Sequence, residues 1–482
     1  MTHHHHAPLN RRSWLKRSGL SAGGALAGGA LGNLLLPARD AQAADYKALV
    51  CVFLYGGNDG LNTIVPTDAG RYAQYSAVRK ALALPQSTLL PLTGTTYGLH
   101  PSLGALRGAW SEKRLAPVFN VGPLQSPLTK EAYRNAPANS PSLPSNLFSH
   151  SDQQTLWETG SASSMTRTGW GGRAAETLAT TNPVISVGGN GRFGLSSLAA
   201  PLVVPGPGEV FEVYELANEP WRLQYAPALA RANTLRSLYR QSWGSDMADA
   251  YAKMQRDAFE VSTRLAAIVK TQPGDSGANA AINAGFASLI VGGKLATPLA
   301  AQLYQAAKLI AANTVVQGSR QIFFASQGGF DTHGGQVAAN TTQGTHADLL
   351  KQLGDALGAF DAAMKNLGLG NAVTLFTQSD FGRTFKPNDS SGTDHAWGNN
   401  HLVLGGAVAG GKTYGSYPEL VLGGKDDVGV QSWEQQGRWI PTTSVDQYAA
   451  TLLGWFGAGD AQLDAILPNL RNFGAARRLG FV

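Results

Sequence analysis

The sequence of 482 residues has little cysteine, little charge and, after residue 43, no cluster of basic side chains. Its lone Cys51 has no second cysteine to pair with, which excludes an intrachain disulfide, a CxxC redox pair and a zinc site built from several thiolates. Any metal ion in this chain must therefore be held by oxygen and nitrogen ligands.

The excess of positive charge is concentrated at the N-terminus. Residues 1–43 hold five of the 38 basic residues and one of the 32 acidic residues. The rest of the chain therefore has 33 basic and 31 acidic residues, which is close to neutral. After residue 43 there is no basic stripe interleaved with aromatic side chains. This charge pattern argues against a nucleic-acid partner.

Residues 1–43 have the three parts of an export signal. A basic head at 11–16 (RRSWLK) precedes an apolar segment over 19–36 and a small-residue cleavage site at 41–43 (AQA). The arginine pair resembles the signal read by the twin-arginine export machinery. A transmembrane anchor is the alternative, but repeated glycines lower the hydrophobicity of the segment. We therefore expect a cleaved signal, a periplasmic or otherwise exported chain starting near Ala44, and no stable membrane span.

The mature chain alternates buried strands with amphipathic helices. Continuous apolar runs rich in β-branched and aromatic residues predict strands, and apolar residues three and four apart predict helices. The predicted strands are 47–55, 116–121, 184–187, 321–326, 371–377 and 401–404, and the predicted helices are 101–114, 298–316, 347–367 and 444–456. This alternation predicts an α/β fold with a mostly parallel sheet and helices on both faces. We expect one domain over 44–482, with a helical insertion near 220–318.

Three of the predicted strands are followed by an aspartate, namely Asp59, Asp331 and Asp380. In an open α/β sheet the site lies beyond the carboxyl ends of the strands, so these side chains are expected at one edge. Carboxylates that converge repel one another unless a cation lies between them, which favours a divalent metal. A single aspartate at such a position is usually a helix cap or an ordinary loop residue, and it is the occurrence of three that favours a metal site.

Histidines lie close to two of these aspartates. In an extended segment, residues two apart project to the same side, so Asp331 and His333 can reach one ion. Carboxylate and imidazole ligands favour zinc, with manganese or calcium as alternatives. The candidate metal ligands are Asp59, Asp331, His333, Asp380, Asp394, His395 and His401. As ordinary loop residues, the same histidines would instead cap carbonyls or pack on an aromatic ring.

A hydrolase at such a centre needs an attacking oxygen, and the segment 149–151 (SHS) offers one. It is predicted to open a helix, where free backbone N–H groups favour an anionic substrate and an alkoxide. Ser149 and His150 are the catalytic candidates, and Thr63 is a weaker nucleophile; a plain N-cap fits the serines equally well. Arg383 is a candidate clamp for a phosphate or sulfate oxygen, with a surface salt bridge as the alternative.

The mature chain carries a series of short motifs in a fixed order. They are 53–63 (FLYGGNDGLNT), 99–103 (LHPSL), 148–154 (FSHSDQQ), 328–333 (GGFDTH), 379–384 (SDFGRT), 392–395 (GTDH) and 440–448 (IPTTSVDQY). Together with the leader they resemble an exported bacterial family, the domain of unknown function numbered fifteen hundred and one. The resemblance covers essentially all of 45–480.

That family is similar in turn to the alkaline phosphatase and sulfatase superfamily, which implies an alkaline-phosphatase-like fold. By this resemblance, Asp59 matches the metal ligand after the first strand. Asp331 and His333 match the paired ligands of one metal, and Asp380 matches a ligand of the other. The resemblance therefore implies a site for two metal ions.

The resemblance also assigns the late histidine ligand to His395 or His401 and the nucleophile to Ser149. Two departures are visible in the sequence. Phe381 follows the last of the strand-end aspartates, where the superfamily often has histidine, so the second metal depends on a substitute ligand. Cys51 lies inside a predicted strand and outside any Cys-x-Pro-x-Arg setting, which excludes a formylglycine mechanism.

These features predict a periplasmic, metal-dependent hydrolase of phosphate or sulfate esters, acting on a small anionic ester or an envelope glycan. The alternative is a non-catalytic exported binding or assembly protein on the same fold, which a large exposed apolar surface on 220–318 would favour. A dinucleotide-dependent oxidoreductase is disfavoured because no GxGxxG motif follows a strand.

Overall fold

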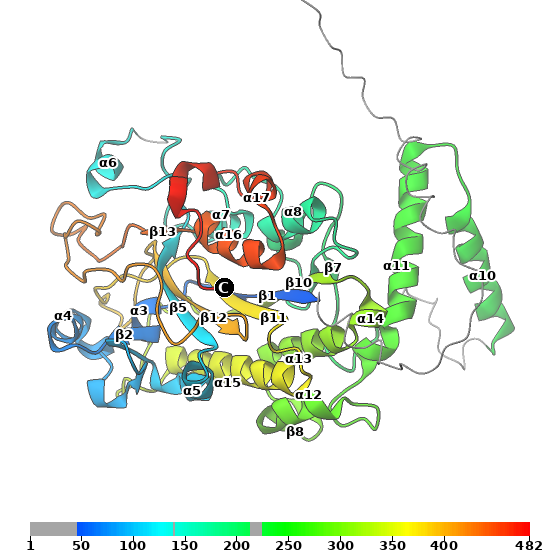
Figure 1. The fold of residues 1–482 in the computed structure, drawn as a ribbon, viewed down its shortest axis with the longest axis horizontal. Helices are drawn as coiled ribbons and strands as arrows, with labels where there is room; N and C mark the ends of the chain where they lie inside the picture. Colours follow the sequence, from blue (N-terminus) through cyan, green and yellow to red (C-terminus); the bar gives the residue numbers. More distant parts are fainter. Residues whose placement is uncertain (1–45, 138–139, 213–223) are drawn as a thin grey trace, which may run out of the picture. The chain divides into compact units, whose positions relative to one another are not determined.

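The structure is a computed structural model that describes residues 46–137, 140–212 and 224–482. An eight-stranded sheet lies at its centre, with helices packed on both faces (Figure 1). The export signal expected over 1–43 lies outside the described residues. Within the described ranges, no helix is long and apolar enough to cross a membrane.

The sheet is mixed but mostly parallel, as the sequence predicts. Its strands are β1 (Lys47–Leu54), β5 (Leu115–Gly122), β6 (Ile185–Ser186), β7 (Leu202–Val203), β10 (Arg320–Gln327), β11 (Val373–Ser379), β12 (Asn399–Gly405) and β13 (Thr443–Ser444). They lie in the order β13-β5-β12-β11-β1-β10-β6-β7, and five of the seven pairings are parallel. The exception is β12, which runs antiparallel to β11 and β5.

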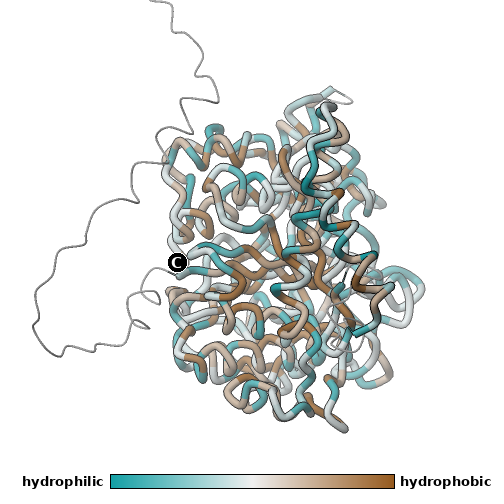
Figure 2. The backbone as a smooth tube through the Cα atoms, turned by 90° about the vertical axis from the view of Figure 1, so that its right-hand side faces the viewer, coloured by the Kyte–Doolittle hydropathy of each residue, from teal (hydrophilic) through white to brown (hydrophobic). Residues whose placement is uncertain are grey.

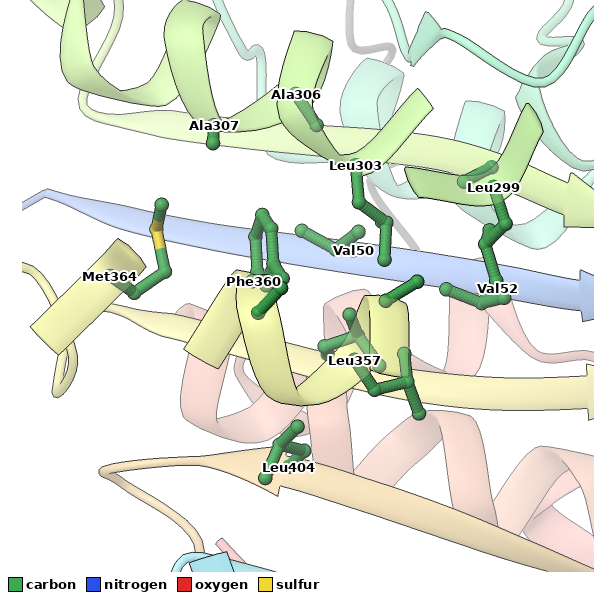
Figure 3. Packing of buried hydrophobic residues seen from close by; sticks show 14 of the residues in the cluster. Val50, Val52, Leu299, Leu303, Ala306, Ala307, Leu357, Phe360, Met364 and Leu404 are labelled. Carbon is green, nitrogen blue, oxygen red and sulfur yellow. The ribbon is translucent and has the colours of Figure 1, made fainter. Parts of the chain in front are cut away.

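The central strand β1 is apolar on both faces because helices cover it on both sides. Val50 and Val52 face one layer, where they pack among Leu303 of α13 (Pro298–Ala311) and Phe360 of α15 (Thr345–Asn366) (Figure 3). Leu49, Cys51 and Phe53 belong to the second core cluster, which lies on the opposite face. Alternating side chains of a strand point to opposite faces, so a run without polar residues is required in the middle of such a sheet.

The opposite layer consists of helices from the middle and the end of the chain. They are α7 (His150–Thr159), α8 (Trp170–Thr177), α16 (Val445–Phe456) and α17 (Asp460–Ile466). Their buried side chains, such as Trp157, Trp170 and Leu452, pack on the sheet. The most hydrophobic stretches of the backbone accordingly cross the middle of the described part (Figure 2).

Further helices and short strands surround these two layers. The helices are α3 (Gly60–Thr63), α4 (Ala69–Arg79), α5 (Arg107–Ser111), α6 (Lys130–Asn135), α10 (Ala226–Arg240), α11 (Asp246–Lys270), α12 (Ala280–Gly285) and α14 (Asn313–Val316). The short strands are β2 (Ile64–Pro66), β3 (Leu90–Pro91), β4 (Tyr97–Leu99), β8 (Ile290–Val291) and β9 (Lys294–Leu295).

The region expected as a helical insertion has two different environments. Helix α13 is buried along most of its length and forms part of the layer that covers the sheet. By contrast, α10 buries only Ala232, and the first half of α11 is largely exposed. Residues 220–223 of the expected insertion lie outside the described residues.

Candidate metal centre

Four side chains converge beyond the carboxyl ends of the central strands. They are His150, Asp331, His333 and His395, and one ligand atom of each lies within 4.8 Å of the others. His150 is the first residue of α7, Asp331 and His333 lie in the loop after β10, and His395 lies in the loop between β11 and β12. Topology therefore brings together residues that are far apart in the sequence.

Glycines allow the loops that carry these side chains to approach closely. A Cβ at Gly392 would lie 2.3 Å from the carbonyl carbon of His333, so only glycine lets the two loops touch here. Gly57 has a φ of +79°, and a Cβ there would lie 2.4 Å from the Phe381 ring. The loop after β1 thus packs against the loop after β11 without space for a side chain.

Each of the three histidines is oriented through Nδ1 by an acceptor on another segment. The pairs are His150 with Asp380 Oδ2 at 2.7 Å, His333 with Asp394 Oδ1 at 3.0 Å, and His395 with the Phe148 carbonyl at 2.7 Å. Carboxylate and carbonyl oxygens only accept hydrogen bonds, so Nδ1 of each ring carries the proton. The lone pair of each neutral imidazole is then on Nε2.

The three Nε2 atoms point toward Asp331. Its Oδ1 lies 3.3 Å from Nε2 of His150, 3.1 Å from that of His333 and 3.8 Å from that of His395. The Nε2 atoms of His333 and His395 are 2.8 Å apart. With both Nδ1 atoms protonated, two neutral rings would bring lone pairs face to face, which is unfavourable unless a cation lies between them.

The residues fit a divalent cation. A tetrahedral zinc ion with bonds of about 2.0–2.1 Å keeps its ligand atoms roughly 3.3 Å apart, close to the spacings found here. Nε2 of His150 is also shielded from solvent and has no hydrogen-bond partner among the described residues. The side chains of Asp331 and His333 are about half exposed, at 47% and 46%, so the group is open to solvent on one side.

Charges around the group act in opposite directions on its members. Burial raises the pKa of Asp331, but the hydrogen bond and charge of Arg383 outweigh burial and hold that pKa below its ordinary value. The hydrogen bond that His150 donates to Asp380 raises the pKa of His150, whereas burial lowers the pKa of His395. Asp331 is therefore an anion in the neutral pH range.

Arg383 holds the loops together from a fully buried position. Its guanidinium donates to Asp331 Oδ1 at 2.5 Å and to a set of carbonyls, which are those of Gly56, Gly57, Phe330 and Thr393. Each of its three nitrogens donates at least one of these bonds, and its side chain is 0% exposed. Arg383 thus positions Asp331, in contrast to the substrate clamp expected from the sequence.

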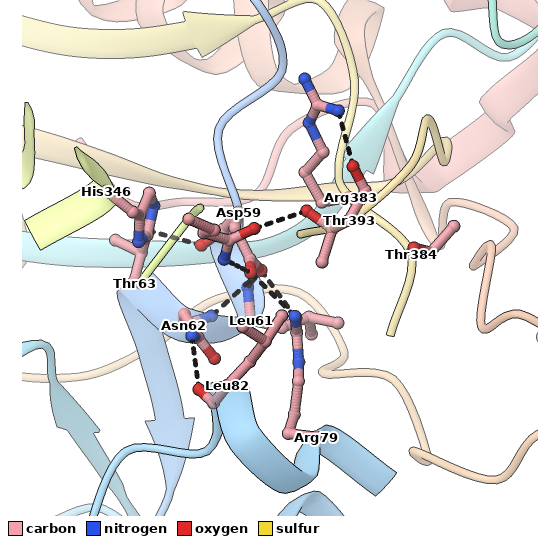
Figure 4. A network of polar contacts seen from close by, with 12 residues as sticks. Asp59, Leu61, Asn62, Thr63, Arg79, Leu82, His346, Arg383, Thr384 and Thr393 are labelled. Carbon is pink, nitrogen blue, oxygen red and sulfur yellow. Dashed lines mark hydrogen bonds and ion pairs between the residues drawn. The ribbon is translucent and has the colours of Figure 1, made fainter. Parts of the chain in front are cut away.

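Asp59 lies outside the four-residue group, in a buried polar network (Figure 4). It accepts two hydrogen bonds from Arg79 at 2.7 and 2.8 Å and one from Gln336 at 2.6 Å. It also caps α3 through the backbone N–H groups of Leu61 and Asn62. Burial raises the pKa of Asp59, but its charged and hydrogen-bonding neighbours, Arg79 first among them, together outweigh burial, so the pKa lies below the ordinary value. Five N–H groups thus donate to the Asp59 carboxylate, which leaves it no free lone pair for a metal ion in the four-residue group.

His401 and Thr63 also lie away from the group. The His401 ring is buried on β12, where its Nδ1 lies 3.3 Å from the Thr377 hydroxyl and the ring packs on Trp157. Burial lowers the pKa of His401 to about 3. Thr63 is buried and donates to the Asp59 carbonyl at 2.8 Å. Both residues are buried in the protein interior and contribute no side chain to the four-residue group.

Ser149 occupies the N-cap position of α7, directly before His150. Its side chain makes no capping bond there. The hydroxyl donates instead to Asp152 Oδ2 at 2.9 Å and lies 3.3 Å from the Ser151 hydroxyl. The serine therefore has a carboxylate acceptor for its proton, next to a member of the four-residue group.

Sequence reasoning missed several contributors to this site. Gln154 donates to Asp380 at 3.0 Å, Asn388 donates to Asp394 at 3.0 Å, and the Phe148 carbonyl orients His395. The Phe148 carbonyl leaves no signal in the sequence, because every residue has one. Gln154 lies four residues after His150, so helical spacing could have placed both on one face of α7.

Phe381 lies against two of the histidines. Its ring centroid is 4.7 Å from those of His150 and His395, and the residue is fully buried. An apolar ring here shields the histidines from water and supplies no ligand atom. This position therefore adds packing to the group and no metal-binding capacity.

The fold and the site together define an α/β protein with a candidate metal centre of three histidines and one aspartate at the carboxyl ends of its central strands. The chain belongs to the family described as "Protein of unknown function (DUF1501)", which matches residues 46–431. No curated protein matches it.

Two solved structures are similar at a low level. They are crystal structures of Ps i-CgsB, alone (TM-score 0.33, 11% identity) and in complex with k-i-k-neocarrahexaose (TM-score 0.34, 12% identity). In both comparisons the match covers 89% of this chain and 77% of the other chain. Such TM-scores do not establish a shared fold.

Proposed function

We propose that this protein is a metal-dependent hydrolase of phosphate or sulfate esters, exported by the twin-arginine machinery, on an alkaline-phosphatase-like fold. His150, Asp331, His333 and His395 hold one divalent ion. The observation that carries the proposal is the convergence of three Nε2 atoms on one carboxylate, with each of these three histidines oriented through Nδ1. Outer acceptors of this kind are typical of metal sites, and the ligand types favour zinc, with manganese or calcium as alternatives.

A bound divalent ion supplies Lewis acidity to ester oxygens and stabilises the negative charge that develops on them. Asp380 and Asp394 keep the proton of their histidines on Nδ1, so that Nε2 is available as a ligand. Ser149 is the proposed nucleophile, with Oδ2 of Asp152 accepting its proton. The Phe381 ring excludes water from the back of the histidines.

A centre for one ion accounts for two features of the chain. Phe381 replaces a ligand that a second ion requires. Asp59, which the family resemblance assigns to the other metal, is neutralised by the Arg79 guanidinium. A fixed positive charge thus takes over the electrostatic role of a second cation beside that carboxylate.

Elemental analysis of the purified mature protein tests the centre. We expect about one equivalent of zinc or manganese in the wild type and none in Asp331→Ala or His333→Ala. Asp389→Ala, which removes an exposed aspartate outside the group, serves as the matched control and should keep its metal. A wild type purified without chelator that holds no metal would contradict the centre.

A panel of phosphate and sulfate esters tests the activity. The metal-loaded wild type should turn over at least one class, and Ser149→Ala should keep its metal while losing turnover by a factor of about a hundred or more. A metal-loaded wild type that is inactive on the whole panel would contradict the hydrolase.

A second candidate is a non-catalytic binding or assembly protein, which exposed apolar residues on α11 favour. Met247, Tyr251 and Met254 are 83%, 57% and 57% exposed. At spacings of four and three residues they share one face of the helix, and contiguous exposed apolar surface marks interaction sites. This function predicts a protein that has neither bound metal nor turnover.

A further inference from the structure

A pocket lies next to His395, since two of its lining residues, Phe148 and Arg438, hydrogen-bond that histidine. It has a volume of about 470 Å³ and is lined by α6 and by residues of 143–148 and 428–438. Two of its lining residues hold His395 directly: the Phe148 carbonyl accepts from Nδ1 at 2.7 Å, and Arg438 Nε donates to the His395 carbonyl at 3.0 Å. A volume of roughly 300–1,000 Å³ is typical of small-molecule sites.

Two charged groups fix the walls of this pocket, the partly buried Lys130 and the buried Asp427. Lys130, the first residue of α6, donates from Nζ to three carbonyls at 2.7–3.0 Å, those of Gly423, Gly424 and Gly429. The carboxylate of Asp427 is fully buried and accepts from the backbone N–H groups of Gly423, Gly429, Gly437 and Arg438. The loop 423–438 is thereby tied to α6 and held in one conformation, which lowers the entropic cost of binding a ligand.

The lining combines aromatic rings with positive charge. The rings are those of Tyr133, Phe148 and Trp433, and the charged groups are those of Arg134, Arg438 and Glu434. Glu434 is engaged, because its Oε2 accepts from the backbone N–H groups of Val430 and Gln431 at 3.0 Å. The lining thus holds two guanidinium groups and one carboxylate, and the carboxylate is already hydrogen-bonded, whereas Arg438 uses only Nε in its bond to His395.

Trp433 shows which kind of ligand suits this chemistry. Its side chain is 73% exposed at the edge of the pocket, although leaving an indole in water is unfavourable. A flat aromatic face offers a stacking surface for a ring with apolar C–H groups, and guanidinium groups bind sulfate, phosphate or carboxylate through paired N–H donors. A saccharide ring that carries a negative charge satisfies both parts of the lining at once.

We infer that this pocket is a subsite for an acidic saccharide unit of the substrate. The ring stacks on Trp433 and Tyr133, and its anionic group pairs with Arg134 and Arg438. The inference rests on the proposed function for one point only. The ester that reacts at the metal centre belongs to the oligosaccharide whose acidic unit occupies this pocket.

The test measures binding without turnover, in the mature His333→Ala protein. Its migration is followed in native gels that contain dextran sulfate or unsulfated dextran, two polymers with the same backbone. We expect dextran sulfate to retard the protein and unsulfated dextran to have little effect. Trp433→Ala and Arg134→Gln should each weaken the retardation about tenfold.

Trp243→Ala is the matched control, because Trp243 is another exposed tryptophan, 52% exposed, and does not line the pocket. Trp433→Ala removes no charge, so its effect separates ring stacking from general attraction to a polyanion. Equal retardation of Trp433→Ala and Trp243→Ala would overturn the subsite. Thermal unfolding of each variant confirms that it is folded.

Failure of the subsite and failure of the proposed function give different results. If retardation depends on Trp433 while the metal-loaded wild type hydrolyses no ester, the saccharide site stands and the hydrolase is wrong. If small esters are hydrolysed while retardation does not depend on Trp433, the hydrolase stands and the subsite is wrong.

Discussion

At the scale of single residues, Asp59 is a buried anion whose charge is balanced by the Arg79 guanidinium. We expect Asp59→Ala to lower the free energy of unfolding by about 3–5 kcal/mol, because it leaves a buried guanidinium unpaired. The metal content should stay at the wild-type value. Chemical denaturation and elemental analysis measure the two quantities, and loss of metal from a folded Asp59→Ala protein would contradict this role.

Asp380 is a positioning residue for His150. Replacement by Asn keeps the shape of the side chain but removes the negative charge that orients Nδ1–H. We expect Asp380→Asn to weaken metal affinity by about 10–100-fold while leaving the binding capacity unchanged at saturating metal. Competition with a metal-binding dye measures the affinity. An unchanged affinity would show that His150 needs no carboxylate to hold its orientation.

The sequence does not separate ligands from the residues that orient them. Asp331, Asp380 and Asp394 were all candidate ligands, and they are chemically identical. In the structure only Asp331 points its oxygen at the three Nε2 atoms, while the other two bind Nδ1 atoms. His150 was a catalytic candidate, and the structure places it in the four-residue group. These roles depend on how distant loops meet, which residue type and spacing do not encode.

At the scale of elements, the strands that end at the site were predictable. The segments 47–55, 321–326 and 371–377 correspond to β1, β10 and β11, because strands buried on both faces leave a continuous apolar run. The antiparallel direction of β12 was not predicted. A strand has the same pattern of buried residues in either direction, and its direction depends on the path of the preceding loop.

The start of α16 carries a buried carboxyl group, Asp446, whose pKa burial raises to about 7 despite the charge of Arg173. The unfolded group titrates near its ordinary value of about 3.9. Between these two values the folded state holds an extra proton, so the free energy of unfolding falls as pH rises from about 4 to 7 and then levels off.

Asp446→Asn should remove the decrease in the free energy of unfolding between about pH 4 and 7, because an asparagine side chain does not titrate. We expect the variant to melt a few degrees above the wild type at pH 8 and at nearly the same temperature at pH 4, where both side chains are neutral. Thermal unfolding across this pH range measures the difference. Parallel melting curves for the two proteins at all pH values would contradict the assignment.

At the scale of the whole molecule, a metal that binds only the native state raises the free energy of unfolding. The gain is about 2.7 kcal/mol when free metal is at 100 times its Kd. Treatment with a chelator should therefore lower the Tm of the wild type by several degrees and leave that of His333→Ala unchanged. Calorimetry of both proteins with and without chelator checks this, and an equal shift in both would show that the chelator acts elsewhere.

The four converging side chains come from three segments: the start of α7, the loop after β10 and the loop before β12. A chain in which any one of these segments is misplaced lacks a complete set of ligands. Metal bound per mole of protein would therefore count correctly folded molecules in a preparation, much as titration with a tight inhibitor counts active sites. That stoichiometry would give every kinetic measurement on this protein its true enzyme concentration.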